Sequence, residues 1–229
     1  NGDFVYTREG AHAHHRILFH EDITGKEITS HLLNAVKKLK NVRMYEYTTL
    51  LDILCDGSKC CGGIIRWPDG REEQVEADYV ILATGGIGGT YKHSTNFKHL
   101  TGDGVEIARR HNIELKNLDY VQIHPTTLYS DNKEERSFLI SESVRGEGAM
   151  LYDKNMNRFV DELLPRDLLT QEIYKQMEKD GTDFVWEDLR TIPRDELISH
   201  FPNIIEHCSQ AGYDVFHECI PIVPAQHYF

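Results

Sequence analysis

The sequence has 229 residues, of which 40% are hydrophobic and 27% are charged, a composition typical of a folded globular protein. Its formal net charge of −12 argues against binding to nucleic acid or to an anionic membrane surface, because both select for basic patches. No apolar run approaches the roughly 20 residues that a membrane-spanning helix needs. Five cysteines, an odd number, favour a reducing cytoplasm over a disulfide framework.

The first segment predicts a strand over Phe4–Thr7, followed by a turn and a run with three histidines. In an extended run, His12 and His14 share one face and His15 points to the other, so the three do not converge on one ion. We therefore expect a polar wall that faces a cofactor or substrate, and no metal site.

A helix is predicted next. Thr24 and Glu27 have the spacing of a capping box, and apolar residues recur at helical spacing from Ile28 to Leu39. Lysines near the end suit the negative end of the helix dipole. The pattern predicts an amphipathic helix that ends at Asn41 and packs on its apolar face.

Short β-like runs separated by turns follow the helix. The turn residues Asp56-Gly57-Ser58 and Pro68-Asp69-Gly70 punctuate them. The alternation predicts a small antiparallel sheet with strands at Val42–Tyr47, Leu50–Cys55, Gly62–Trp67 and Glu73–Glu76.

Two glycine-containing segments indicate a nucleotide cofactor. The apolar run Ala77–Ala83, followed by Thr84-Gly85-Gly86, predicts a buried parallel strand that ends in a loop close to a ligand. Thr101–Gly104 opens a helix that continues to His111, which puts free amides and a carboxylate where a cofactor's phosphates or hydroxyls bind.

Polar residues gather in the stretch Tyr120–Asp167, among apolar, small and turn-forming residues. Arginine and glutamate rarely settle beside buried apolar residues without a partner or a polar ligand. The stretch therefore favours a pocket for a small anion, with surface ion pairs on a lid as the alternative. Its polar members are His124, Ser141, Glu142, Arg145, Glu147 and Arg166.

The last third predicts packing elements. Apolar spacing after Pro165 indicates a helix to Met177. The other expected elements are a hairpin with strands at Met150–Tyr152 and Arg158–Val160, a strand at Phe184–Asp188, and short helices at Pro193–Phe201 and Asn203–Ala211.

The order of several motifs resembles the succinate dehydrogenase/fumarate reductase flavoprotein superfamily and, within it, the L-aspartate oxidase family most closely. These motifs are R-E-G-A-H-A-H-H-R-I, A-T-G-G, T-G-D-G, H-P-T-T-L-Y, S-E-S-V-R-G-E-G-A, L-P-R-D-L and I-P-I-V-P-A-Q-H-Y. The family's G-x-G-x-x-G fingerprint for the FAD pyrophosphate is absent, as is its C-terminal FAD segment. The resemblance thus implies the middle of a longer enzyme.

For the fold, the resemblance implies an α/β (α+β) chain. Residues 1–118 would form part of an FAD-binding domain with the small antiparallel sheet. Residues 119–222 would form an α+β capping domain that covers the substrate, and residues 223–229 would return to the FAD domain.

The resemblance also implies roles for individual residues. Arg166 matches the family's proton-transferring arginine, with Glu142 beside it and a carboxylate clamp as its alternative role. The implied substrate ligands are Glu9, His124, Ser141, Glu142 and His227; Ser141 replaces the family's threonine, and Glu9 would face the substrate ammonium. The implied FAD ligands are Thr49, Leu50, Ala83, Thr84, Gly85, Gly86 and Asp103.

The expected activity is FAD-dependent oxidation of L-aspartate to iminoaspartate, the first step of NAD biosynthesis from aspartate. Oxygen or fumarate would reoxidise the flavin, and quinolinate synthase is a candidate partner. A fumarate reductase or succinate dehydrogenase flavoprotein is the second hypothesis, and a lid or interaction module without activity is the third. We expect the chain by itself to be inactive, because about half of the FAD cradle is missing from it.

Overall fold

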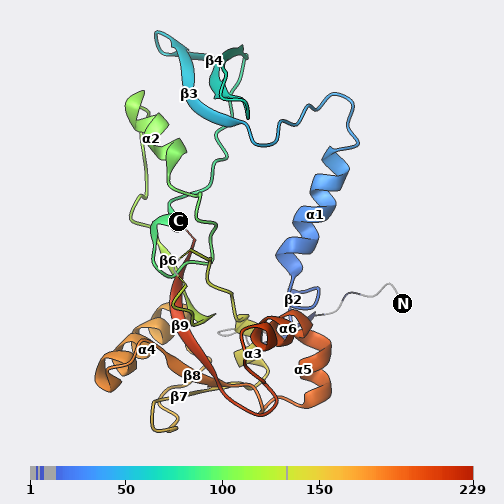
Figure 1. The fold of residues 1–229 in the computed structure, drawn as a ribbon, viewed down its shortest axis with the longest axis vertical. Coiled ribbons are helices and arrows are strands. Elements are labelled where there is room, and N and C mark those ends of the chain that lie inside the picture. The colour runs from blue at the N-terminus through green and yellow to red at the C-terminus, as the bar shows by residue number, and fades with distance from the viewer. Residues whose placement is uncertain (1–3, 5, 8–13, 133, 229) are drawn as a thin grey trace.

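The computed structural model describes residues 4, 6–7, 14–132 and 134–228. These residues form three antiparallel sheets with strand orders β1-β2, β3-β4-β5 and β6-β9-β8-β7 (Figure 1). The strands are β1 (Tyr6–Thr7), β2 (Ile17–Leu18), β3 (Thr49–Asp56), β4 (Lys59–Arg66), β5 (Glu72–Glu76), β6 (Gln122–Leu128), β7 (Met150–Tyr152), β8 (Val185–Asp188) and β9 (Ile220–Tyr228).

Helices occur in both halves of the chain, and none of those in the described part is long and apolar enough to cross a membrane. They are α1 (Thr24–Val36), the 3-10 turn η1 (Gly88–Thr90), α2 (Asp103–Arg110), α3 (Glu142–Gly146), α4 (Arg166–Asp180), α5 (Arg194–His200) and α6 (Pro202–Gln210).

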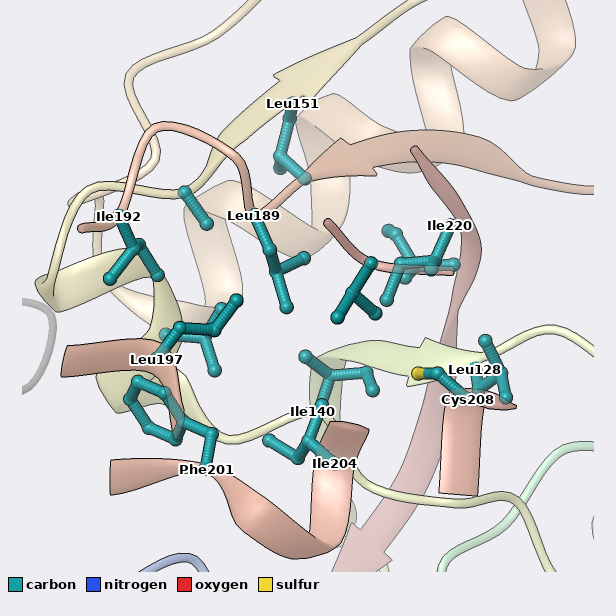
Figure 2. Packing of buried hydrophobic residues seen from close by; sticks show 14 of the residues in the cluster. Leu128, Ile140, Leu151, Leu189, Ile192, Leu197, Phe201, Ile204, Cys208 and Ile220 are labelled. Atoms are coloured by element: carbon teal, nitrogen blue, oxygen red, sulfur yellow. The ribbon is translucent and has the colours of Figure 1, made fainter. Parts of the chain in front are cut away.

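The main hydrophobic core surrounds the four-stranded sheet. Every buried hydrophobic residue of this cluster lies between Leu128 and Ile222, and Figure 2 shows Leu151, Leu189 and Ile220 among them. Helix α4 packs on this sheet because Leu169 and Ile173, four residues apart, lie on one face and are fully buried. The segment 119–222 that was expected to form a capping domain thus has a core of its own.

The small sheet β3-β4-β5 confirms three of the four strands expected there. The predicted strand Val42–Tyr47 is wrong, because those residues form turns and irregular backbone. Helix α2 is tied to the sheet through side chains of its last turn: His111 Nε2 lies 2.8 Å from Asp52 Oδ1, and Arg110 Nη2 donates to the Leu51 carbonyl at 3.0 Å.

Helix α1 begins at Thr24 as expected but ends at Val36, not at Asn41. The predicted capping box is wrong: Thr24 is already helical, and its hydroxyl accepts a hydrogen bond from the His20 amide. The expected packing face is also not buried, since no residue of α1 is buried and Leu32 is 63% exposed.

The predicted parallel strand at Ala77–Ala83 is wrong too. The structure has no strand there, and Tyr79 and Ile81 are 90% and 88% exposed. A parallel strand needs neighbouring strands on which to bond and pack. Among the described residues no strand pairs with this run, so its apolar residues have nothing to cover them.

The helices and two of the strands predicted for the last third are confirmed, with small shifts in bounds, but the predicted strand Arg158–Val160 is wrong. Helices α4, α5 and α6 and strands β7 and β8 all form, whereas the expected hairpin is reduced to a single bridge between Tyr152 and Arg158. Strands β6 and β9 and helix α3 were not expected as elements. The mixed α/β (α+β) class is confirmed, and the domain boundaries at 118 and 222 stay predictions.

Candidate active site

Arg166 is held in place by two acceptors from other parts of the chain. As the first residue of α4, it donates from Nε to Glu142 Oε2 at 2.6 Å and from Nη1 to Gln122 Oε1 at 3.2 Å. Glu142, the first residue of α3, is buried, whereas the Arg166 side chain remains 32% exposed. A charge-assisted bond this short fixes the guanidinium while leaving part of it free to meet a ligand.

Two histidines lie side by side next to this pair. His124 on β6 and His227 on β9 have ring centroids 5.4 Å apart, in an edge-on arrangement. Desolvation, helped by the positive charges of Arg145 and Arg166, lowers the pKa of His124 well below its usual value. Desolvation and Arg166 lower the pKa of His227 to about 4. Both rings are therefore neutral at pH 7.

The contacts at Nδ1 differ between the two rings. His124 Nδ1 lies 3.0 Å from the Thr126 carbonyl oxygen and 3.2 Å from the Thr126 amide, and Thr95 Oγ1 lies 2.6 Å from His227 Nδ1. The shorter contact to a carbonyl, which can only accept, favours the ring proton of His124 on Nδ1, whereas the Thr95 hydroxyl can donate to His227 Nδ1 or accept from it. His227 can donate from Nε2 to a carboxylate when the Thr95 hydroxyl donates to its Nδ1.

Ser141 is the N-cap of α3 and directly precedes Glu142. Its hydroxyl accepts from the Ser143 amide at 3.3 Å, so the side chain satisfies a free helix amide. Its role toward a substrate stays a prediction, as does that of Glu9, which lies outside the described residues.

The cofactor residues implied by sequence lie in a different place. Thr84 packs against Gly104 at the start of α2 so closely that a Cβ on Gly104 would collide with Thr84 Oγ1. Gly85 has φ +73°, a conformation that favours glycine, and Asp103 Oδ1 accepts from Thr101 Oγ1 at 2.8 Å. The missing Cβ of Gly104 thus lets Thr84 pack on the first turn of α2, beside free backbone amides of the kind that bind phosphates.

The other residues implied to bind FAD lie on elements bonded to α2 or in the loop that packs on it. Thr49 and Leu50 begin β3, whose neighbouring residues bind the last turn of α2, while Asp103 begins the same helix. Ala83 and Gly86 flank Thr84 and Gly85 in the exposed loop. Their contacts with FAD stay predictions.

Sequence reasoning missed Gln122, Thr95 and Asn96. Gln122 is two residues before His124 on one strand, and the period of two was a usable signal. Asn96 Nδ2 donates to the His227 carbonyl at 2.7 Å, and Thr95 binds the His227 ring, but the segment 94–96 has no local pattern. The parallel bridge between Ser94 and Gln226, together with side-chain hydrogen bonds to Gln226, brings it there.

Comparison with known proteins gives consistent matches. The L-aspartate oxidase of Clostridium perfringens is 48% identical over 225 residues, which are 98% of this chain and 51% of the relative. That of Clostridium acetobutylicum is 43% identical over 229 residues, 100% of this chain and 52% of the relative. The chain thus spans about half the length of these curated relatives.

The fold also matches a solved structure titled "Quinol-Fumarate Reductase with Menaquinol Molecules". It has a TM-score of 0.85 and 29% identity, and the alignment covers 98% of this chain and 42% of that chain. These matches confirm the resemblance to the flavoprotein superfamily. The model of the FAD binding domain matches residues 1–229, so FAD is the expected cofactor, and the chain belongs to the FAD-binding domain family.

Proposed function

We propose that this chain is part of an FAD-dependent oxidoreductase that converts L-aspartate to iminoaspartate. The observation that carries the proposal is the cluster of Arg166, Glu142, His124 and His227, in a chain whose relatives are named L-aspartate oxidase. One partly exposed cation with two neutral histidines beside it suits a dicarboxylate, because charge-assisted hydrogen bonds anchor carboxylates well.

Each residue has a distinct part in this proposal. His124 and His227 contact one carboxylate, with Ser141 as a hydroxyl donor. Arg166 binds the substrate next to the reacting carbon and transfers the proton that the substrate nitrogen releases as the hydride leaves Cα, and Glu142 holds Arg166 in position. Glu9 faces the substrate ammonium. FAD, when bound, supplies the acceptor for the hydride that leaves Cα, and oxygen or fumarate takes up the electrons afterwards.

The main alternative is a fumarate reductase or succinate dehydrogenase flavoprotein. The structural match at TM-score 0.85 favours it, and the same donors suit succinate or fumarate. A lid or interaction module without activity remains the third candidate for this chain taken by itself. The cytoplasmic location and the handing of iminoaspartate to quinolinate synthase rest on composition and family resemblance alone.

Anaerobic reduction of the flavin separates these functions. In the full-length protein, the visible flavin band should bleach after addition of L-aspartate and persist after addition of succinate. Bleaching by succinate alone would move the protein to the dehydrogenase branch. Bleaching by neither, in protein that holds FAD, would refute oxidation of both substrates.

A further inference from the structure

Three cysteines gather at the tip of the β3–β4 hairpin, outside the candidate active site. Cys55 is the last residue but one of β3, and Cys60 and Cys61 lie near the start of β4. In Figure 1 this hairpin lies at one end of the molecule, and β7 and β8 lie at the other. No set of three or more His, Cys, Asp or Glu residues in the described part of the chain is arranged to hold a metal ion, so the three thiols do not form a metal site there.

The strand register places Cys55 directly opposite Cys60. A two-residue loop joins the strands, Asp56 pairs with Lys59 across it, and Cys55 pairs with Cys60 next. The hydrogen bond of such a turn joins the residues that flank the loop, and hydrogen-bonded and non-hydrogen-bonded pairs alternate along an antiparallel ladder. Cys55–Cys60 is therefore a non-hydrogen-bonded pair, in which Cα atoms lie about 4.5 Å apart. Disulfides span Cα separations of about 4.4–6.8 Å, so this backbone suits a bond between the two sulfurs.

Cys61 is the extra residue of a β-bulge. Leu54 pairs with Gly62 and Cys55 pairs with Cys60, which leaves Cys61 between two register positions. Its sulfur lies 3.4 Å from the Leu54 carbonyl oxygen. The bulge thus offers Cys55 a second neighbouring thiol, but Cys60 is the one in the register position opposite it.

A small molecule from solvent can reach Cys55. This residue is exposed, whereas Cys60 and Cys61 are half-buried. A surface cavity of about 540 Å³ beside the hairpin is lined by Cys55, Cys61, Lys59 and Glu76, among others. A reagent that enters this cavity therefore meets the Cys55 side chain.

We propose that Cys55 and Cys60 are a redox-sensitive pair that closes to a cross-strand disulfide on reaction with a low-molecular-weight disulfide. One thiolate of the pair attacks the small disulfide, which forms a mixed disulfide and releases one small thiol. The other thiolate then attacks the bound cysteine sulfur, forms the Cys55–Cys60 bond and releases the second small thiol. The pair loses two electrons and two protons, and the small disulfide gains both. This inference goes beyond the proposed oxidation of L-aspartate and does not depend on it.

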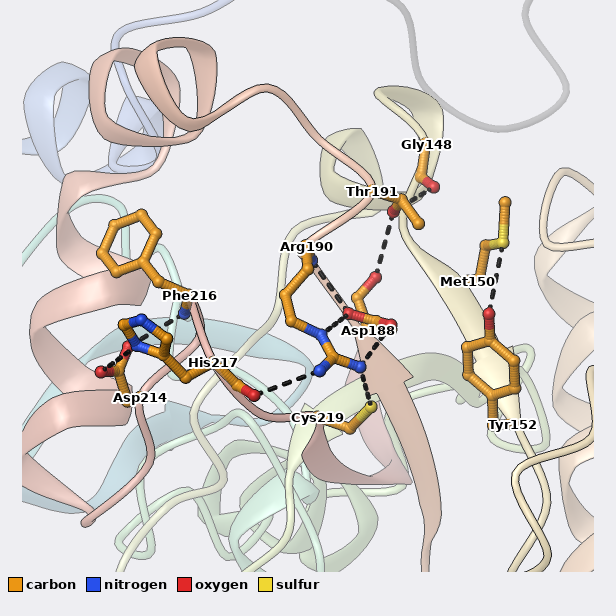
Figure 3. Close-up of polar contacts among 10 residues, drawn as sticks. All are labelled: Gly148, Met150, Tyr152, Asp188, Arg190, Thr191, Asp214, Phe216, His217 and Cys219. Carbon is orange, nitrogen blue, oxygen red and sulfur yellow. Dashed lines mark hydrogen bonds and ion pairs between the residues drawn. The ribbon is translucent and has the colours of Figure 1, made fainter.

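The other two cysteines lack this arrangement. Cys208 on α6 is 0% exposed in the hydrophobic core. Cys219 precedes β9, and Arg190 Nη2 lies 3.5 Å from its sulfur (Figure 3). Neither residue lies in a strand, so neither has a cysteine opposite it across a sheet.

The pair differs from a catalytic dithiol. Desolvation of the sulfur, together with the neighbouring thiolates of Cys60 and Cys61, raises the pKa of Cys55. Rapidly reacting cysteines have a lowered pKa instead, because the thiolate is the nucleophile. We therefore expect slow, reversible oxidation of the kind found in redox-sensing disulfides of reducing compartments.

The test treats the reduced, full-length, flavin-loaded protein with glutathione disulfide under anaerobic conditions at about pH 8, where thiolate is populated. Remaining thiols are alkylated, and tryptic peptides are analysed by mass spectrometry. Cleavage after Lys59 separates Cys55 from Cys60, so the disulfide joins two peptides that dithiothreitol releases. We expect most of these two peptides to be joined after treatment. Peptides that stay separate, whether alkylated or bound only to glutathione, would overturn the proposal.

Three variants identify the partner of Cys55. C60S should abolish the joined peptides and leave the Cys55 peptide bound to glutathione, whereas C61S should keep them joined. C219S is the control outside the hairpin and should behave as wild type. Joined peptides that persist in C60S and are lost in C61S would overturn the assignment of Cys60. Retained flavin absorbance checks that each variant is folded.

Discussion

Helices α1 and α4 show how differently the two regions of this chain are built. Helix α1 has 13 residues and buries none of them, whereas α4 has 15 residues and buries four. The hydrophobic cluster lies wholly between Leu128 and Ile222, and the described residues before it contribute few buried apolar side chains, such as Ile53 and Ile107. An amphipathic pattern thus predicts a helix reliably, but burial needs a second surface.

The candidate active site draws on both regions unequally. Arg166, Glu142 and His124 lie on elements packed on the dense core, whereas the segment with Thr95 is joined to β9 by a backbone bridge and by side-chain hydrogen bonds. The residues implied by the family resemblance to bind FAD lie on the loosely packed region. The contrast predicts that catalysis, stability and cofactor binding respond to different substitutions.

The largest effect is expected from Arg166→Lys in the full-length protein. Lysine keeps the charge but loses the planar guanidinium that binds Glu142 and Gln122. Turnover of L-aspartate should fall about 10²- to 10⁴-fold, with the bound flavin retained. Absorbance of the flavin and steady-state rates measure the two quantities, and near-normal turnover would leave Arg166 at most a positioning role.

The matched pair Ile173→Ala and Ile28→Ala tests the packing contrast. Ile173 on α4 is fully buried and Ile28 on α1 is 56% exposed. We expect Ile173→Ala to lower the free energy of unfolding by about 2–5 kcal/mol and Ile28→Ala to change it by less than about 0.5 kcal/mol. Urea denaturation of the 229-residue chain gives both values. Equal losses in the full-length protein would mean that α1 acquires a buried face there.

The pH dependence of the free energy of unfolding gives a second comparison, between the two neighbouring carboxylates Glu187 and Asp188. Burial raises the folded-state pKa of Glu187 to about 7, above the unfolded value, so the folded state binds its proton more tightly. The stability contributed by this group is complete below the unfolded pKa and is lost as the pH rises through about 7. The free energy of unfolding of Glu187→Gln, relative to that of wild type, should therefore increase by up to about 3 kcal/mol between pH 4.5 and pH 8.

For Asp188→Asn we expect the free energy of unfolding, relative to that of wild type, to change with pH in the opposite direction. The hydrogen bonds from Arg190 lower the pKa of Asp188, so its stabilisation is present above the unfolded pKa and lost as the pH falls. Thermal unfolding at several pH values compares the two variants. If the gain of Glu187→Gln were independent of pH, the buried ionisation assigned to Glu187 would be excluded.

The smallest effect is expected in the loosely packed region, from Gly104→Ala. The added Cβ would strike Thr84 and displace the loop that we propose to contact FAD, at a cost of about 1–3 kcal/mol. FAD should bind more weakly to the full-length variant, as measured by quenching of flavin fluorescence. Gly25→Ala on α1 is the control, because nothing lies within 4 Å of its added Cβ; unchanged FAD binding in Gly104→Ala would separate this loop from the cofactor.

The sequence by itself determined the elements whose hydrogen bonds are local. Alternation and tight turns predicted β3, β4 and β5, and apolar spacing after Pro165 predicted α4. Motifs also singled out Arg166, Glu142 and both site histidines. Local patterns suffice here because strands joined by short turns, and turns of one helix, find their partners within a few residues.

Only the tertiary structure decided which distant residues meet and which charges are buried. Strand β6 pairs with β9 across about one hundred residues of chain, with His124 opposite Ala225, and this pairing brings His124 to His227. Nothing in the sequence marks Glu187 as buried; in the structure it lies on β8 between β7 and β9. Long-range pairing and burial depend on all surrounding elements together, and no local pattern contains that information.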